Sequence, residues 1–181
     1  MLHLQYPNNE YRDLWENIMN EFMENKEKII PYALYLKTDN YSDYLKMTDA
    51  FHIGNNISEH LVSSTTYFLF NEKEDKILGA INIRHNLNNS LLMHGGHIGY
   101  GVAPSERRKG YATEMLSLAL KKCREIGIKE ALVTCDKGNI GSSKTIIKNH
   151  GILENELIEE NGNIVQRYWI DVPVGFMKME V

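Results

Sequence analysis

Apolar residues recur along this chain with two different periods, and each change of period predicts a change between helix and strand. Apolar positions three or four residues apart predict helices over residues 9–25, 41–51, 110–127 and 140–150, the second being the weakest. Short apolar or alternating runs between turn residues predict strands over 2–6, 66–70, 76–84, 95–102 and 131–135. Residues 49–64 show no clear period and are expected to form a loop, and 86–93 a linker of at most one helical turn.

The C-terminal part of the chain carries a hairpin signal. Two β-like runs, 152–159 and 164–170, flank Asn161-Gly162, and Asn-Gly between such runs is a strong hairpin signal. The predicted order is therefore β-α-α-β-β-β-α-β-α-β-β, and no repeat or linker divides it. We expect one domain over residues 1–181 of the α/β (α+β) class, with a mixed, mostly antiparallel central sheet flanked by helices.

Composition narrows the class of partner. The chain has 181 residues, 43% of them apolar, and a net charge of −4, so no general affinity for nucleic acid or anionic membranes is implied. Its N-terminus lacks the apolar core of a signal peptide, and no run of about 18 apolar residues occurs. Cys123 and Cys135 fall in apolar positions. We therefore expect a cytoplasmic protein with two buried free thiols.

The segment HIGYGVAPSERRKGYAT, residues 97–113, is a local exception to the acidic balance. A strand runs into the turn Arg107-Arg108-Lys109-Gly110, which opens directly into the helix predicted over 110–127. Backbone N–H groups at a helix N-terminus attract anions, and Gly110 and Ala112 leave room for a phosphate. A solvated basic cap is the alternative, but cations at this end oppose the helix dipole. The segment therefore predicts a site for the pyrophosphate of a nucleotide-like cofactor.

This segment, with the strand before it and Asn139 and Ser142 after the next strand, resembles the GNAT superfamily of acetyl-CoA-dependent N-acyltransferases. The match covers about residues 78–151, and the GGHIGY and PSERRKGYAT runs resemble a bacterial subfamily labelled only as predicted acetyltransferases. The resemblance implies direct attack of a substrate amine on acetyl-CoA. It also implies a set of cofactor-binding residues, namely Val102, Arg107, Arg108, Lys109, Gly110, Tyr111, Ala112, Thr113, Asn139 and Ser142.

Catalytic roles are less well defined by the sequence. A neutral amine must attack, so a general base near neutrality would help, and His97 is the candidate because it lies in the strand that carries the thioester site. The alternative for His97 is a buried histidine hydrogen-bonded to backbone. Many relatives carry a tyrosine as general acid seven residues after the asparagine, where this chain has Ile146. Tyr100, Tyr111 or water are left to protonate the thiolate.

The acceptor is not identified. Arg84 and His85 close the strand predicted over 76–84 and could bind a substrate anion, or cap the sheet. We expect a small-molecule or peptide amine and no nucleic-acid or membrane partner, and a homodimer is compatible with the sequence. The N-terminal part also contains acidic residues that are compatible with a cationic amine, namely Asp39, Asp43, Asp49 and Glu59.

Three other features of the sequence bear on its function: a histidine pair, a loop similar to Walker A, and Ile146. His94 and His97 have no carboxylate near them in the sequence and make a poor zinc site, so no metal is expected. Residues 138–145, GNIGSSKT, resemble a Walker A loop, but Ser143 replaces its second glycine and the residues that follow predict only a hairpin. Lys144 is accordingly interpreted as a surface lysine. A GNAT-like module that binds acyl-CoA without turnover remains the alternative function, because Ile146 replaces the usual tyrosine.

Overall fold

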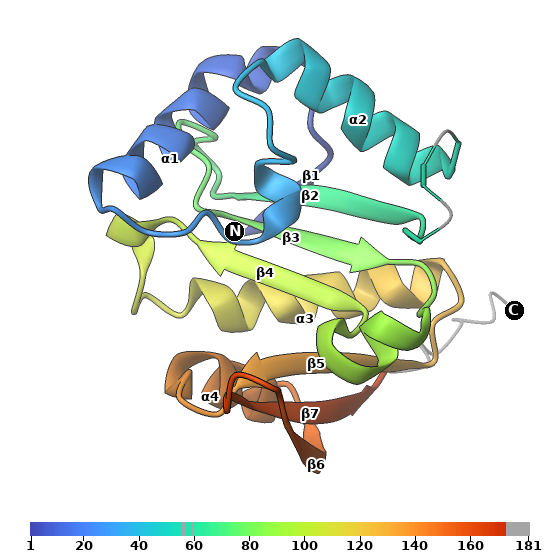
Figure 1. Cartoon of the computed structure of the whole chain (residues 1–181). Helices are drawn as coiled ribbons and strands as arrows, with labels where there is room; N and C mark the ends of the chain where they lie inside the picture. The colour runs from blue at the N-terminus through green and yellow to red at the C-terminus, as the bar shows by residue number, and fades with distance from the viewer. Residues whose placement is uncertain (56, 59, 173–181) are drawn as a thin grey trace, which may run out of the picture.

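The strands form two sheets in which every described pairing is antiparallel (Figure 1). The protein is represented by a computed structural model, and the structure describes residues 1–55, 57–58 and 60–172. The first sheet has the order β1-β2-β3-β4, and the second has the order β5-β7-β6. The strands are β1 (His3–Gln5), β2 (Ser64–Phe70), β3 (Gly79–Arg84), β4 (Ile98–Val102), β5 (Glu130–Asp136), β6 (Ile152–Ile158) and β7 (Ile164–Asp171).

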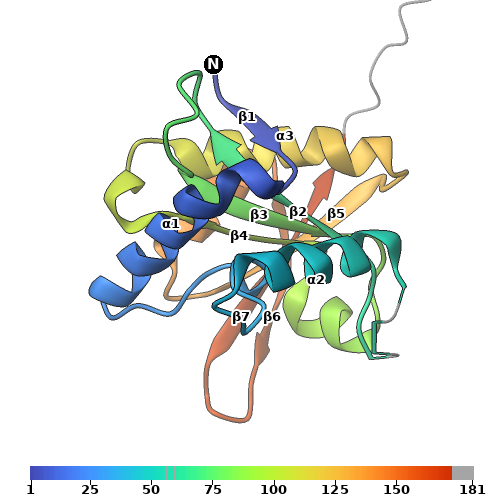
Figure 2. The same ribbon diagram turned by 90° about the horizontal axis from the view of Figure 1, so that it is seen from above.

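Helices cover both faces of the first sheet (Figure 2). The main helices are α1 (Arg12–Glu24), α2 (Tyr41–Ile53), α3 (Tyr111–Glu125) and α4 (Ile140–Lys148). Short helical turns connect them: η1 (Asn9–Tyr11), η2 (Tyr32–Leu34), η3 (Leu91–Gly95) and η4 (Pro104–Glu106). The first two helices, α1 and α2, lie on one face and α3 lies on the other. This layering buries two apolar clusters, one on each side of the sheet.

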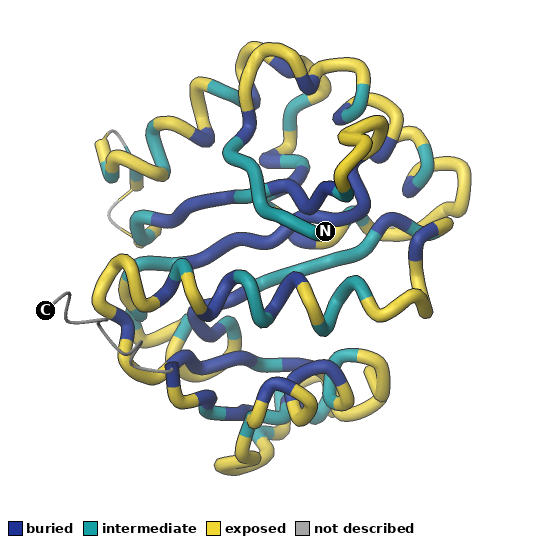
Figure 3. The backbone as a smooth tube through the Cα atoms, turned by 180° about the vertical axis from the view of Figure 1, so that it is seen from behind, coloured by how far each residue is buried: buried dark blue, intermediate teal, exposed yellow. Residues whose placement is uncertain are grey.

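Strand alternation explains how one sheet feeds two cores. In β2, Phe68 and Phe70 belong to the cluster under α1 and α2, whereas Leu69 belongs to the cluster under α3. In β3, Ala80 joins the first cluster, and Ile81 joins the second. Figure 3 shows these central strands buried along most of their length. Because both faces are covered, the strands appear in the sequence as near-continuous apolar runs.

The predicted order of elements is confirmed, with a few boundaries shifted. The predicted strand 95–102 begins only at Ile98, because η3 occupies the preceding residues and Gly96 turns the chain with φ 64°. The second helix ends at Ile53, two residues later than predicted, and is followed by Gly54, whose left-handed φ of 80° favours glycine. The Asn161-Gly162 hairpin forms between β6 and β7, with Gly162 at φ 84°. The first two of these shifts arise where glycines let the backbone reverse.

The two cysteines are buried and free, as the sequence predicts. Burial raises the pKa of the Cys123 thiol to about 12 and that of Cys135 to about 11, so both stay protonated and unreactive near neutral pH. No helix in the described part of the chain has the length and apolar character that a bilayer crossing requires.

Candidate active site

The two sheets touch at one end and diverge at the other. At the closed end, the His97 N–H donates to the Leu132 carbonyl at 2.7 Å, and the Leu132 N–H donates to His97 Nδ1 at 3.0 Å. Among the described residues, β4 and β5 share no strand ladder beyond this point. Where they diverge, a cleft of about 750 Å³ opens between β4, the start of α3 and α4.

The cleft gathers nearly all the predicted cofactor residues. Lys109 does not line it, but the others do: Val102, Arg107, Arg108, Gly110, Tyr111, Ala112, Thr113, Asn139 and Ser142. The sequence had not predicted the contribution of the N-terminal part of the chain, which supplies Phe22, Glu27 and Ile30 to the same wall. These residues enter because α1 and the segment after it pack across β4, which no short motif could reveal.

The N-terminus of α3 is open toward this cleft. Helices α2 and α4 are capped by Asn40 and Asn139, whose side chains accept backbone N–H groups. Helix α3 begins instead after Gly110, at φ 87°, with no side-chain cap. Within the described residues, the N–H groups of Gly110, Tyr111 and Ala112 have no hydrogen-bond acceptor, whereas that of Thr113 donates to the Gly110 carbonyl at 3.1 Å. Free N–H groups and the positive end of the helix dipole suit an anion.

The three cations before α3 differ in their partners. Arg107 forms a two-point ion pair with Glu27, with Nη1–Oε1 at 3.0 Å and Nη2–Oε2 at 2.5 Å. Lys109 pairs at 2.9 Å with the buried Glu106, which Lys76 also contacts. Burial by itself would raise the pKa of Glu106, but the hydrogen bonds from the two lysines lower it overall.

These ion pairs leave one cation of the turn available to a ligand. Arg108 makes no ion pair within the residues that the structure describes. Its backbone adopts a left-handed φ of 62°. Carboxylates neutralise Arg107 and Lys109. The turn therefore opposes the dipole of α3 less than three unpaired cations at its N-terminus would.

The edge of β4 that faces the cleft pairs with no other strand among the described residues, and only the Val102 carbonyl on it accepts a side-chain hydrogen bond, from Arg107 Nε at 3.4 Å. On either side of β4, the Arg84 N–H donates to the His97 carbonyl and the Ala103 N–H donates to the Leu78 carbonyl. The His97 carbonyl and the Ala103 N–H are therefore directed toward β3 and the segment before it. Successive residues of a strand direct their N–H and C=O groups to opposite edges. Tyr100 and Val102 therefore direct theirs away from β3, toward the cleft. Such an edge can pair with an extended ligand as an added strand would.

Tyr100 also directs its phenol across the cleft. Its hydroxyl donates to the Ser142 carbonyl of α4 at 3.4 Å, and burial raises its pKa to about 12. The hydroxyl is therefore protonated at neutral pH. Ile146, at the position where many relatives carry tyrosine, is fully buried and packs beneath Gly151. The phenol near the start of α4 is therefore supplied by Tyr100 of β4, and not by a tyrosine within α4.

Helix α4 contributes two residues that the sequence did not single out as ligands. Lys144 and Lys148 are one turn apart and both line the cleft, whereas Lys144 had been interpreted as a plain surface lysine. The i, i+4 spacing is the only sequence signal that places them on one face. The Walker-like loop before them is an ordinary helix start, with Asn139 Oδ1 accepting the Ser142 N–H at 3.0 Å. The strand ahead of it, β5, pairs antiparallel with β7, unlike a P-loop sheet.

His97 lies at the closed end of the cleft, and its hydrogen bonding limits what it can do. Because Nδ1 accepts the Leu132 N–H, the neutral ring carries its proton on Nε2. Burial, helped by the nearby Arg84, lowers the pKa of His97, so the ring is neutral at pH 7. Its free nitrogen therefore presents a donor rather than a lone pair. The geometry favours the interpretation of His97 as a buried histidine bonded to backbone.

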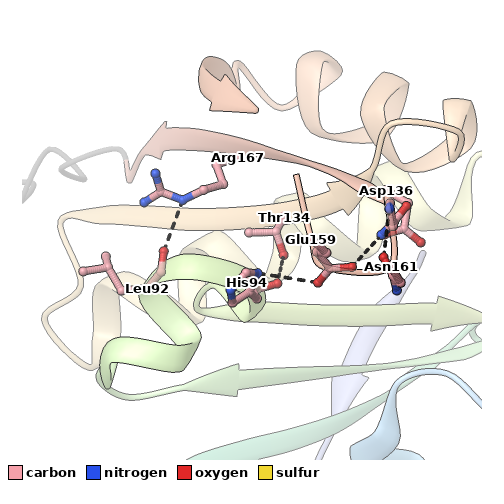
Figure 4. A network of polar contacts seen from close by, with 8 residues as sticks. Leu92, His94, Thr134, Asp136, Glu159, Asn161 and Arg167 are labelled. Carbon is pink, nitrogen blue, oxygen red and sulfur yellow. Dashed lines mark hydrogen bonds and ion pairs between the residues drawn. The ribbon is translucent and has the colours of Figure 1, made fainter. Parts of the chain in front are cut away.

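A polar network fixes η3 between the two sheets (Figure 4). Arg167 Nε of β7 donates to the Leu92 carbonyl at 3.1 Å, and Thr134 Oγ1 of β5 donates to the His94 carbonyl at 2.9 Å. His94 Nδ1 also lies 3.5 Å from a Glu159 carboxylate oxygen of the β6–β7 hairpin, a carboxylate that the sequence had not placed near it. The network joins the C-terminal hairpin to the segment that precedes β4.

Arg84 and His85 follow each other in the sequence but separate in space. Arg84 Nη1 donates to the carbonyls of Gly95 and Gly96, both at 2.9 Å, and its side chain lines a second cavity under α2. His85 Nε2 instead contacts Thr65 Oγ1 at 2.8 Å, and this hydroxyl also contacts His52. Burial first, and then His52, lowers the pKa of His85. The two residues therefore do not form one anion site.

Solved structures of acetyltransferases share the fold of this chain. The structure resembles the microcin self-immunity acetyltransferase MccE, solved with acetyl-CoA and AMP, with 20% identity and a TM-score of 0.64 over 94% of this chain and 92% of that one. It also resembles RimL, a ribosomal-protein alpha-N-acetyltransferase solved with coenzyme A, with 15% identity and a TM-score of 0.69 over 94% of each chain.

A third solved structure contains mutant forms of the spermidine/spermine N-acetyltransferase SpeG from Vibrio cholerae, with 16% identity and a TM-score of 0.64 over 94% of this chain and 93% of that one. At these identities the likeness establishes the fold alone. Among curated proteins, no sequence gives a significant match. The family model described as "Acetyltransferase (GNAT) domain" matches residues 10–151, well over half of the sequence. This chain therefore belongs to the GNAT acetyltransferase family.

Proposed function

We propose that this protein is an acetyl-CoA-dependent N-acetyltransferase that transfers an acetyl group to a primary amine of a small molecule or peptide. The observation that supports this most directly is the convergence of two unpaired backbone elements on one cleft. The open N-terminus of α3 suits a pyrophosphate, and the free edge of β4 suits the amide-containing pantetheine arm. The proposal requires no metal, and we expect the enzyme to act in the cytoplasm.

Each wall of the cleft has its own task in this proposal. The N–H groups of Gly110, Tyr111 and Ala112 hold the pyrophosphate, with Arg108 and the two lysines of α4 adding positive charge. The backbone of Tyr100 and Val102 holds the pantetheine arm in register. One of these amides also faces the thioester oxygen and stabilises the negative charge that develops on it.

The chemistry is a direct transfer. The amine nitrogen forms a bond to the acetyl carbon, the carbon–sulfur bond breaks, the nitrogen loses a proton and the sulfur gains one. Tyr100 is protonated and directed toward the start of α4, which suits it to supply the proton to sulfur. His97 remains a candidate to assist the amine. Its backbone N–H and Nδ1 hold the closed end of the cleft, and its Nε2 carries a proton, so the ring suits a positioning role better than taking a proton.

The similar structures support an amine acceptor without naming it. RimL is a ribosomal-protein alpha-N-acetyltransferase and SpeG is a spermidine/spermine N-acetyltransferase, so this fold serves both protein and small-molecule amines. The cleft of this chain has the open helix end and free strand edge that such a transfer requires.

Cofactor binding is tested by Ala112→Asp. A carboxylate in the first turn of α3 is favourable to the helix dipole, so the fold should be kept while the pyrophosphate is repelled. We expect acetyl-CoA affinity, measured by calorimetry, to fall about 10- to 100-fold. Lys121→Gln changes the net charge by the same amount further along α3 and should leave affinity unchanged. Equal affinities for Ala112→Asp and wild type would contradict the proposed site.

Turnover is tested separately, by thiol release from acetyl-CoA with a panel of amines. Steady release with at least one amine supports the enzyme. Acetyl-CoA that raises the melting temperature but gives no release with any amine would favour the alternative of an acyl-CoA-binding module.

A further inference from the structure

The sheet face beneath α1 and α2 changes character along its length. Near β1 this face is apolar, with Phe68, Phe70 and Ala80 in the core. Farther along the same strands, the side chains that alternation places on this face are polar, namely Ser64, Thr66, Asn82 and Arg84. Ser64, Thr66 and Asn82 are only 8%, 3% and 4% exposed. A core needs no such set of buried polar groups, so their presence calls for another explanation.

These polar residues line a cavity of about 250 Å³ enclosed by α2, η2 and η3. At about 30 Å³ for each water molecule, this volume corresponds to roughly eight non-hydrogen atoms. Asn82 Nδ2 donates to both Ser64 Oγ and Thr66 Oγ1 at 3.1 Å, which orders the floor of the cavity. The cavity therefore combines an ordered polar floor with apolar walls, among them Leu36 and Phe51, and has the size of a small molecule.

Arg84 lines this pocket and has two donor groups without a partner among the described residues. Its Nη1 group is held by the Gly95 and Gly96 carbonyls. Nε and Nη2, the parallel donors that match a carboxylate, have no partner within the described residues, and no carboxylate there lies within ion-pair distance. Burial lowers the pKa of the guanidinium, because the charged form is partly desolvated. No anion among the described residues offsets this unfavourable desolvation.

The pocket borders the strand that carries the proposed thioester site. A Cβ atom at Gly99 of β4 would lie 3.5 Å from Arg84 Nη2 and 3.8 Å from Pro31 Cβ. Pro31 lines this pocket, while its neighbour Ile30 lines the large cleft. A small molecule held by Arg84 would therefore lie against the face of β4, next to the strand edge assigned to the cofactor.

We propose that this pocket, which we call the Arg84 pocket, binds the acceptor through a carboxylate, so that the substrate is a small amino acid or a similar compound with both an amine and a carboxylate. The proposal rests on the acetyltransferase function proposed above. Arg84 binds the carboxylate side-on through Nε and Nη2, and Ser64, Thr66 and Asn82 bind the remaining polar atoms. The amine is then directed over Gly99 toward the cleft.

This proposal keeps the anion-binding role that the sequence suggested for Arg84, and it assigns no role to the acidic residues of the N-terminal part. No aspartate or glutamate of the described chain lines the Arg84 pocket. Asp43 pairs with Lys46, Asp49 accepts from the Tyr6 hydroxyl, and Asp39 lines a different cavity near α1. Glu59 lies outside the described residues. The charged group that the fold places at the pocket is a cation, which favours an acceptor that carries a carboxylate.

The test compares amino acids with their carboxamides, in which an uncharged amide of similar size replaces the carboxylate. Thiol release gives kcat/KM for each pair in the wild type, in Arg84→Gln and in Arg12→Gln, a control at an exposed arginine of α1. We expect the wild type and the control to prefer the acid about 10- to 100-fold, the worth of a charge-assisted hydrogen-bonded pair. Arg84→Gln should lose this preference through a higher KM for the acid, with the KM for acetyl-CoA unchanged.

A merely structural role for Arg84, holding η3, predicts a different result. Arg84→Gln would then lower kcat/KM for acids and carboxamides equally, and the carboxylate proposal would fail while the acetyltransferase stood. The proposal also fails if the wild type shows no preference for acids.

A second measurement does not depend on turnover. In the wild type, the NMR signal of the Arg84 Nε–H group, assigned from its absence in Arg84→Lys, should shift when amino acids are added and not when their carboxamides are. An unmoved signal overturns the carboxylate proposal. A shifted signal without thiol release for any amine supports carboxylate binding and contradicts the proposed enzyme.

Discussion

The contact between Gly101 and Ile30 allows a sharp test of how the N-terminal segment is seated on β4. A Cβ atom at Gly101 would lie 2.1 Å from the Ile30 carbonyl oxygen and 2.7 Å from its carbon, whereas ordinary contact begins at about 3.4 Å. Gly101 pairs with Ala80 of β3 within the β3–β4 ladder, so this part of β4 is held in place. In Gly101→Ala the segment around Ile30 must therefore move by more than 1 Å.

The expected cost follows from this geometry. Forcing extra atoms into a packed site costs about 1–3 kcal/mol. For a protein of this size that corresponds to a melting temperature lower by roughly 2–4 °C for each kcal/mol. The free energy of unfolding is measured by urea titration, and Gly138→Ala is the matched control because no atom lies within 4 Å of a Cβ added there. Equal stability of Gly101→Ala, Gly138→Ala and wild type would refute the close packing of this segment on β4.

Three further predictions concern single side chains. Because the pKa of His97 is lowered, its contribution to stability is present above its ordinary pKa of 6.5 and is lost as the pH falls below that value, by up to about 1.4 kcal/mol per pH unit. In His97→Gln, the free energy of unfolding measured by urea titration should therefore depend less on pH between about pH 5 and 8. An unchanged pH dependence would contradict the buried neutral ring. Asn139→Ala removes the cap of α4 and should lower the free energy of unfolding by about 0.5–2 kcal/mol, a loss that Asn139→Asp should largely avoid if capping is its role. Tyr100→Phe should lower kcat about 100-fold with unchanged acetyl-CoA affinity, and full activity would exclude Tyr100 as the proton donor.

The residues proposed to bind the cofactor could be selected from local signals in the sequence more readily than the proposed catalytic groups. The basic turn and Gly110 lie next to one another in the chain, and the helix that follows determines their geometry, so the anion site could be predicted from one short segment. Lys109 was the exception, because Glu106, three residues earlier, holds it away from the cleft. Lys144 is an exposed helix residue, as the sequence predicts, and only the packing of α4 beside β4 brings it to the cleft wall.

Pairings between distant segments decided the remaining roles. Whether His97 offers a lone pair depends on the Leu132 N–H, which lies 35 residues away in the chain. The charge at the acceptor pocket likewise depends on which polar residues of β2, β3 and η3 share one face, and not on the acidic content of the N-terminal part.

The sequence by itself determined the order of helices and strands, the open start of α3 and the family, because periodicity, turn residues and a contiguous motif act over a few neighbouring residues. Only the tertiary structure decided where the sheets diverge, which nitrogen of His97 is engaged and that Arg84 stands alone in a pocket without a described anion. The physical reason is that protonation states and pocket charges depend on groups brought within a few ångströms by folding. Such distances are set by packing across the whole chain, and no local pattern encodes them.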